Sequence, residues 1–237
     1  MTTGATVSPC CDMTMRSSPA DRIVFDLDDT LYLERDFAFS GFAAVGHWVE
    51  ARHGVPGFAA MCRALFDSPH RPAIFDEALR RTGLTDRQTV GELVGIYRDH
   101  DPRIALCPDA ARYLDRRGGM FGLITDGPDR MQRNKIAALG LSRHFDQIIP
   151  TGQWGAGFGK PHPRAFQEIE AAAPDRRCVY VADNPRKDFV TPNRMGWITV
   201  QICRPGRVHL VSPPDRAHAA QRVIETFDQL DAALSAD

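Results

Sequence analysis

Three carboxylates follow a short apolar stretch near the N-terminus of the chain. The segment IVFDLDDTLY (residues 23–32) passes from Ile, Val and Phe directly to Asp26, Asp28 and Asp29. An apolar run that ends at polar residues is typical of a buried strand. Because side chains alternate along a strand, Asp26 and Asp28 point to the same side, where they repel each other unless a cation lies between them. The spacing therefore predicts a cation site at the end of this strand.

Further polar residues stand at the ends of later apolar runs or shortly after them. They are Thr125, Asp126, Lys160, Asp183 and Asp188. In open parallel sheets, ligands bind beyond the carboxyl ends of the strands. We therefore expect these side chains to share one site with the two aspartates of the first run.

These residue types have complementary chemistry. A lysine beside a helix N-terminus favours an anion, and a threonine beside free main-chain amides can hold phosphate oxygens. A small number of hard carboxylate oxygens suits Mg²⁺ better than Zn²⁺. Aspartate can be phosphorylated covalently, and a second carboxylate two residues away can act as a general acid and then as a general base. Together they predict a site for a phosphate, a magnesium ion and a carboxylate nucleophile.

Short apolar runs, separated by helical patterns, recur along the chain and would position these residues. The predicted strands are residues 22–27, 120–125, 146–149, 178–182 and 197–202. Strands that alternate with helices pair in parallel through crossover helices. The fold class that we predict is α/β, with a doubly wound parallel sheet.

The chain between the first and second predicted strands is far longer than one crossover requires. Two sets of its apolar residues share a helical face: Phe42, Val45 and Val49, and then Val90, Leu93, Val94 and Tyr97. We predict an inserted helical cap at residues 35–101. The core would comprise residues 21–34 and 102–237, and residues 1–20 would form a flexible N-terminal arm.

Three further elements are predicted in the second half of the chain. A helix begins at Pro108 and ends at Gly118, and residues 204–215 form a loop. The apolar face of a last helix is predicted from the spacing of Val223, Phe227, Leu230 and Leu234.

The composition is that of an ordinary globular protein, and it excludes several functional classes. The 237 residues carry a net charge of −1 and are 43% hydrophobic, without a basic patch for nucleic acid or an anionic membrane. No apolar stretch is long enough to span a bilayer, and residues 1–21 lack the apolar centre of a secretory signal. The six cysteines follow no metal or disulfide spacing. We expect a cytoplasmic protein that binds neither nucleic acid nor a membrane.

Four motifs in the chain resemble those of the haloacid dehalogenase superfamily of phosphohydrolases. They are DLDDT (26–30), LIT (123–125), GKP (159–161) and DNPRKD (183–188), and they occur in the order of the family. The resemblance implies a Rossmann-like core with a helical cap inserted between the first and second motifs. The predicted insert lies at that place in the chain.

The resemblance also implies roles for the residues of the first motif and their metal partners. Asp26 would be the nucleophile and a metal ligand. Asp28 would be the general acid and base, and its main-chain carbonyl would also bind the metal. Asp183 would be the third protein ligand of Mg²⁺. Asp188 would be a partner of the water on the metal or of Lys160.

The remaining motif residues would bind the substrate phosphate. Thr125 and Lys160 match the family's phosphate ligands, and Lys160 would also neutralise the charge of the nucleophile. Asp126 stands at the same strand end and is a further candidate for the phosphate site. Asp126 and Asp29 could instead be turn or cap residues, for which aspartate is common.

The function that the resemblance implies is a Mg²⁺-dependent phosphatase that hydrolyses a small phosphorylated metabolite through an aspartyl-phosphate on Asp26. Dehalogenation and phosphotransfer by a mutase are alternatives on the same fold, and a non-catalytic binding protein is another. Dehalogenation needs neither Asp28 nor Asp183, and Thr30 stands where mutases of the family tend to carry Val. A binding protein would be expected to lack one of the reactive residues, and none is missing. The sequence names neither the substrate nor the oligomeric state.

Overall fold

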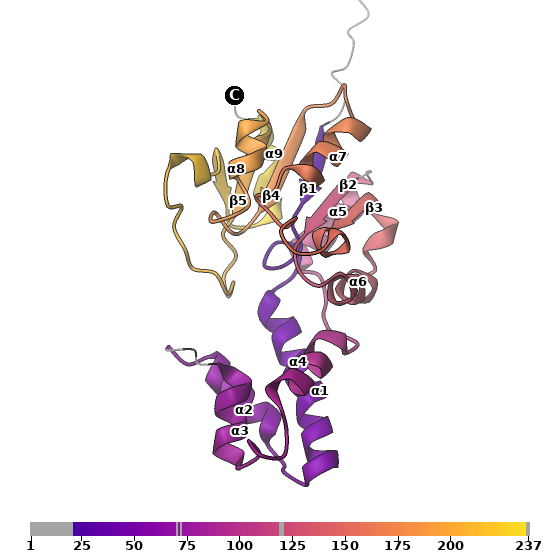
Figure 1. The fold of residues 1–237 in the computed structure, drawn as a ribbon. Coiled ribbons are helices and arrows are strands. Elements are labelled where there is room, and N and C mark those ends of the chain that lie inside the picture. The colour runs from indigo at the N-terminus through magenta and orange to yellow at the C-terminus, as the bar shows by residue number, and fades with distance from the viewer. Residues whose placement is uncertain (1–20, 70, 72, 119–120, 236–237) are drawn as a thin grey trace, which may run out of the picture.

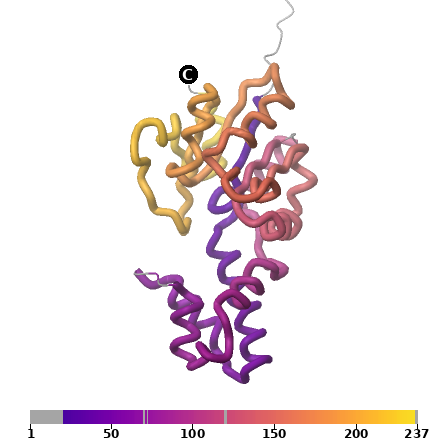
Figure 2. The backbone as a smooth tube through the Cα atoms, in the orientation of Figure 1, coloured from indigo at the N-terminus to yellow at the C-terminus, as the bar shows by residue number. Residues whose placement is uncertain are grey.

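The computed structural model of the protein describes residues 21–69, 71, 73–118 and 121–235. The predicted N-terminal arm, residues 1–20, lies outside the described residues. Figure 1 shows a sheet with helices on its faces and a separate group of helices at one end of the molecule, and the tube in Figure 2 follows the same path.

Within the described residues, six parallel strands form one sheet in the order β3-β2-β1-β4-β5-β6. The strands are β1 (Arg22–Phe25), β2 (Phe121–Thr125), β3 (Phe145–Pro150), β4 (Cys178–Ala182), β5 (Ile198–Ile202) and β6 (Arg222–Ile224). The chain winds from β1 outward to β3 and then returns to β4 on the other side of β1. This confirms the predicted doubly wound parallel α/β sheet. The winding reverses between β1 and β4, where ligands bind in such sheets.

Alternation along β1 supplies both faces of the core. Ile23 and Phe25 belong to the apolar cluster that contains α5, α6 and α9, whereas Val24 packs in a second cluster with α7. The helices of this region are α5 (Pro108–Arg117), α6 (Asp129–Ala138), α7 (Arg164–Ala172), α8 (Val190–Arg194) and α9 (Leu230–Ser235). The short 3-10 turns are Leu141–Arg143, Thr151–Trp154, Arg216–His218 and Phe227–Gln229. The helix predicted to begin at Pro108 and end before Gly118 is confirmed as α5.

The prediction for the last helix was wrong at its start. Val223 lies in β6, pairs with Gln201 of β5 and is 63% exposed. The helical turn begins only after Thr226, whose side-chain oxygen accepts the main-chain N–H of Asp228. Phe227 and Leu230 are buried as predicted. Val223 matched the helical spacing by coincidence, because an edge strand of three residues leaves too short a pattern to reveal its period.

The helices between β1 and α5 surround an apolar cluster of their own. They are α1 (Glu34–His53), α2 (Phe58–Phe66), α3 (Ile74–Thr82) and α4 (Val90–Asp99). Phe42, Val45 and Val49 of α1 lie in this cluster with Leu93 of α4. The four helices, which we call the cap helices, lie at the opposite end of the molecule from β6 and α9 (Figure 1). The division of the chain into a core and a cap domain stays our prediction.

Two further features of the described residues concern membrane-spanning helices and cysteines. Among the helices of the described ranges, none is both long and apolar enough to cross a membrane. The cysteines in these ranges carry free thiols, and they are Cys62, Cys107, Cys178 and Cys203.

Candidate active site

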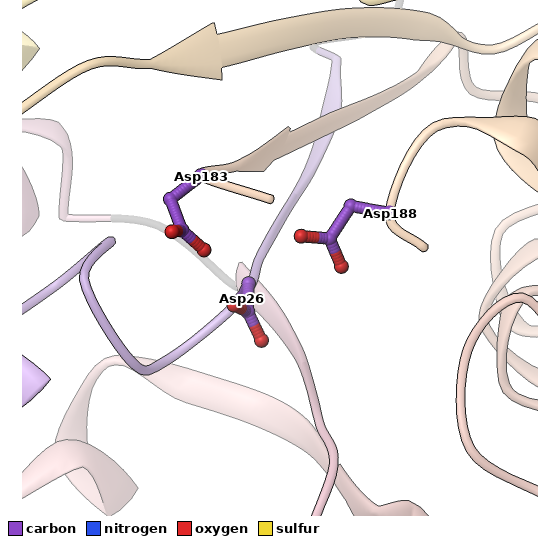
Figure 3. Close-up of side chains that lie close together, drawn as sticks. All are labelled: Asp26, Asp183 and Asp188. Carbon is purple, nitrogen blue, oxygen red and sulfur yellow. The ribbon is translucent and has the colours of Figure 1, made fainter. Parts of the chain in front are cut away.

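The carboxyl ends of β1, β2 and β4 bring the predicted site residues together at the reversal of the sheet. Asp26 follows β1, and its main-chain N–H continues the pairing with β4 by donating to the carbonyl of Val181 at 2.9 Å. Asp183 follows β4, and Asp188 lies in the next turn. Figure 3 shows the carboxylates of Asp26, Asp183 and Asp188 pointing toward one another. One oxygen of each carboxylate lies within 4.8 Å of one oxygen of each of the other two, and all three side chains are buried.

Lys160 supplies a positive charge inside this group of carboxylates. Its Nζ lies 2.6 Å from an oxygen of Asp26 and 2.7 Å from an oxygen of Asp188, and it donates to the hydroxyl of Tyr180 at 2.9 Å. Burial acts to lower the pKa of Lys160, but Asp188 and Asp26 hold it well above its ordinary value. A buried ammonium is stable only when it is paired. Lys160 is therefore charged and held against Asp26.

One lysine does not balance three buried carboxylates. Burial, together with Asp188 and Asp26, raises the pKa of Asp183 to about 9. Within the described residues, Oδ2 of Asp183 is buried and has no hydrogen-bond partner. Burial also raises the pKa of Asp26 to about 6, although Lys160 opposes this. The cluster has the charge and the oxygen donors that a further cation needs.

Asp28 has different surroundings from Asp26, although it stands only two positions further along the chain. Its Oδ1 lies 2.7 Å from Nζ of Lys135 and accepts the hydroxyl of Tyr32. Burial acts to raise the pKa of Asp28, but Lys135 and the hydrogen bond from Tyr32 hold it below its ordinary value. Asp28 lines a cavity of about 140 Å³ that Asp26, Asp126 and Asp183 also line. We call this space the site cavity.

Thr125 and Asp126 lie at the end of β2 but offer different groups. Thr125 is buried, and its hydroxyl has no hydrogen-bond partner among the described residues, so it can bind a ligand. The carboxylate of Asp126 already accepts the main-chain N–H of Lys160 at 3.0 Å and the hydroxyl of Thr151 at 2.9 Å, and pairs with Lys187 at 3.0 Å. An ionised carboxylate has no proton to donate to a phosphate. The carboxylate of Asp126 is thus engaged by groups of the protein, and phosphate binding by Asp126 stays a prediction.

A sequence model of the haloacid dehalogenase-like hydrolase family matches residues 20–196. The chain belongs to the haloacid dehalogenase-like hydrolases. All four motifs lie inside the matched range.

Similar proteins in this family include phosphatases of two named activities. A phosphoserine phosphatase of Thermus thermophilus is 33% identical over 172 residues, which is 68% of this chain and 66% of that protein. The chain thus spans just under two thirds of that relative. A glyceraldehyde 3-phosphate phosphatase of Methanopyrus kandleri is 31% identical over 77% of this chain and 83% of that protein. The corresponding enzyme of Methanocaldococcus jannaschii is 29% identical over 77% and 84%.

Solved structures of the family share the fold. L-2-haloacid dehalogenase from Xanthobacter autotrophicus superposes with a TM-score of 0.58 at 18% identity, and covers 91% of this chain and 98% of its own. A phosphatase of the family from Thermococcus onnurineus gives a TM-score of 0.54 at 22% identity, with 92% and 99% covered. Because a dehalogenase and a phosphatase have the same fold, the reaction must be argued from the site.

The site cavity is also lined by residues to which the family motifs assign no role, and the sequence analysis did not predict them. They are Glu34, Met131, Gln132, Lys135, Asn184, Lys187 and His209. Asn184 and Lys187 stand inside the DNPRKD motif. The position of Lys187 directly before Asp188 was a signal that could have identified Lys187 as a site residue. Lys135 lies in α6, and nothing in its local pattern separates it from the exposed basic residues of that helix.

Glu34 and His209 come from distant parts of the chain. Nε2 of His209 lies 3.4 Å from the carboxylate of Glu34, and the hydrogen bond to Glu34 raises the pKa of His209. Asp29 holds both segments, because its carboxylate accepts the main-chain N–H of Glu34 at 2.8 Å and that of Val208 at 2.6 Å. Asp29 thus acts as a cap for the start of α1, in line with the cap role considered for it, and it aligns the loop that carries His209.

Proposed function

We propose that this protein is a Mg²⁺-dependent phosphatase that hydrolyses a small phosphomonoester through an aspartyl-phosphate on Asp26. The observation that carries this proposal is the placement of Asp26. It lies between the ammonium of Lys160 at 2.6 Å and the unpartnered carboxylate oxygen of Asp183. Such a site can hold a nucleophilic carboxylate beside a cation and a phosphate. The phosphatase relatives support the same reaction.

In the first step, a carboxylate oxygen of Asp26 attacks the phosphorus atom of the ester. The phosphorus–oxygen bond to the alcohol breaks, and the leaving oxygen takes a proton from Asp28. The charge on the transferred group is neutralised by Lys160. The free hydroxyl of Thr125 donates to a phosphate oxygen. The products are the free alcohol and phosphorylated Asp26.

In the second step, a water molecule attacks the phosphorus of the aspartyl-phosphate. Asp28, now ionised, accepts the proton of this water, and the bond between phosphorus and Asp26 breaks. Inorganic phosphate leaves, and both aspartates return to their starting states. Asp28 and the contacts that hold it favour hydrolysis of a phosphate ester over dehalogenation, because a halide leaving group needs no proton.

The metal site would consist of the Asp26 and Asp183 carboxylates and the main-chain carbonyl of Asp28. These are hard oxygen donors in small number, which suits Mg²⁺ and leaves room for water and substrate. A magnesium ion bound there would neutralise charge on the phosphate and on Asp26. The orphaned Oδ2 of Asp183 supports this assignment.

Without bound ligands, Asp26 and Asp28 do not have the pKa values that the proposed reaction requires. In the protein alone the pKa of Asp26 is raised to about 6, by burial, and that of Asp28 is lowered. The reaction requires the opposite, because Asp26 must be ionised to act as the nucleophile and Asp28 must be protonated to act as the general acid. A cation beside Asp26 lowers its pKa, and the negative phosphate beside Asp28 raises that of Asp28. Ligand binding would thus produce the reactive protonation states.

The phosphatase relatives support a small phosphorylated substrate. Its phosphate group would lie in the site cavity of about 140 Å³. Glu34 and His209, which also line this cavity, are candidates for contact with the remainder of the substrate. The expected cytoplasmic location, and the absence of nucleic acid and membrane partners, stay predictions.

A screen of phosphorylated metabolites with and without Mg²⁺ tests the proposal. It should include phosphoserine, glyceraldehyde 3-phosphate and 4-nitrophenyl phosphate, with Asp26→Asn as the matched control. We expect phosphate release that requires Mg²⁺ and is abolished in the control, because the amide cannot form the acyl phosphate. Full activity of folded Asp26→Asn protein, or no phosphate release from any ester, would contradict the proposal.

A further inference from the structure

A buried lysine outside the family's four motifs contacts the side chain that we assign to acid and base catalysis. Lys135 of α6 has an exposed fraction of 2%, and its Nζ lies 2.7 Å from Oδ1 of Asp28. The other basic residues of this helix, Arg130 and Arg133, are exposed and pair with aspartates at the surface. Burying an ammonium is costly unless it is paired. The contact with Asp28 is therefore the feature that explains why Lys135 is buried.

The two oxygens of Asp28 are held unequally. Oδ1 contacts Lys135 and accepts the hydroxyl of Tyr32, whereas Oδ2 has, among the described residues, only a long contact of 3.4 Å from Nε2 of Gln132. One oxygen is thus fixed by a charged group and a hydroxyl, and the other is left for a ligand in the site cavity. We propose that Lys135 is a positioning residue, which anchors Oδ1 of Asp28 so that Oδ2 exchanges the proton with the substrate.

The surroundings of Lys135 restrict where its ammonium can lie. Its Nζ sits 4.3 Å from the centroid of the buried ring of Phe37, in the first turn of α1. The helix that carries it is also attached to the end of α4, where Asn134 donates to the carbonyls of Asp99 and His100 at 3.4 Å. The cation–π contact with Phe37 adds to the ion pair. Lys135 is therefore held between the cap helices and Asp28, away from solvent.

This inference rests on the proposed function, since it concerns how the proton donor of that reaction is oriented. A structural ion pair and a positioning residue differ in one measurable respect. If the ion pair only stabilises the fold, its loss lowers the fraction of folded enzyme and reduces the rate of hydrolysis of all substrates alike. Loss of a positioned acid slows esters in proportion to how much their leaving group needs a proton.

The test compares phenyl phosphate, a poor leaving group, with 4-nitrophenyl phosphate, a good one, in full-length Lys135→Met protein. Because kcat/KM includes only steps up to release of the phenol, it isolates the step in which Asp28 acts as an acid. We expect kcat/KM for phenyl phosphate to fall about 10- to 100-fold, a part of the usual effect of acid catalysis, and that for 4-nitrophenyl phosphate less than about 3-fold. Lys135→Arg should recover part of the selective loss. Arg133→Met, which removes an exposed charge from the same helix, should leave both values unchanged.

Thermal unfolding checks that each variant is folded, and Lys135→Gln replaces the methionine variant if that one does not fold. An equal loss on both esters, or no loss on either, would overturn the role of Lys135 while wild-type activity leaves the phosphatase proposal intact. A wild-type protein that hydrolyses neither ester, and none of the screened metabolites, would instead overturn the phosphatase proposal itself.

Discussion

The Nζ atom of Lys160 lies 2.7 Å from a carboxylate oxygen of Asp188, and both side chains are fully buried. The same ammonium contacts Asp26, so it is shared between two carboxylates. Asp188 is fixed in turn, because its second oxygen accepts the main-chain N–H of Asn184 at 2.9 Å. Asp188 thus orients Lys160 toward the proposed nucleophile.

The two partners of this ion pair should respond differently to substitution. Lys160→Met leaves the buried carboxylates without their lysine, and we expect the free energy of unfolding to fall by about 3–5 kcal/mol. Asp188→Asn keeps a side-chain acceptor and removes one repelling charge, so we expect a change below about 1 kcal/mol and a loss of activity. Urea unfolding of the metal-free proteins measures the free energy of unfolding of each variant. Equal destabilisation by the two substitutions would show that repulsion in the cluster is unimportant.

The stability of the metal-free protein should depend on pH through Asp183. Burial raises its pKa from 3.8 to about 9 in the folded protein, so between these values the folded state holds a proton that the unfolded state has lost. The contribution of Asp183 to stability is therefore present at low pH and is lost as the pH rises toward 9. Thermal unfolding with a chelator at several pH values should show a steeper decline for the wild type than for Asp183→Asn. Parallel curves would contradict a raised pKa.

Added Mg²⁺ should raise the melting temperature, because the ion binds the folded state alone. At a concentration of about 100 times Kd, the expected stabilisation is about 2.7 kcal/mol. Asp183→Ala should abolish the shift and most of the activity, and its metal-free form should melt at or above the wild-type temperature. Asp175→Ala, which changes an exposed aspartate, is the matched control. A normal Mg²⁺ shift in Asp183→Ala protein would place the metal elsewhere.

Asp28→Asn should harm the two half-reactions unequally. Nitrophenolate leaves with little protonation, so phosphorylation of Asp26 continues, while hydrolysis of the aspartyl-phosphate loses a base worth about 10²–10⁴-fold. We expect a burst of about one nitrophenol per enzyme followed by slow turnover. Rapid-mixing kinetics and mass spectrometry of acid-quenched protein detect the burst and the trapped phosphate. If neither is seen and all esters lose activity alike, Asp28 shapes the site without transferring a proton.

Glu34 and His209 should affect substrate binding more than the chemical step. Both line the site cavity, and they contact each other at 3.4 Å. A hydrogen bond from either to the substrate is worth about 0.5–1.5 kcal/mol, so Glu34→Gln and His209→Asn should each raise KM about 2- to 10-fold for the preferred metabolite. We expect kcat to change less than about 2-fold. A fall in kcat at constant KM would assign these residues to catalysis instead.

The sequence by itself determined the sheet and the position of the reactive residues along it. The apolar runs that end at Asp26, Thr125 and Asp183 predicted parallel strands, and such strands bring their carboxyl ends to one edge. The convergence of these residues in the structure follows from that rule and from the order of the chain. Local alternation also predicted that Asp26 and Asp28 point to one side, without any knowledge of what each would contact.

Only the tertiary structure decided the environment of each group. Lys135 reaches Asp28 across 107 positions of sequence, and Glu34 meets His209 where Asp29 bonds to both of their segments. The opposite pKa directions of Asp26 and Asp28 likewise arise from burial and from lysines on other elements. A pattern in sequence reports which way a side chain points from its own strand or helix. Burial and charge depend on what packs opposite it, and that is fixed only when distant segments fold together.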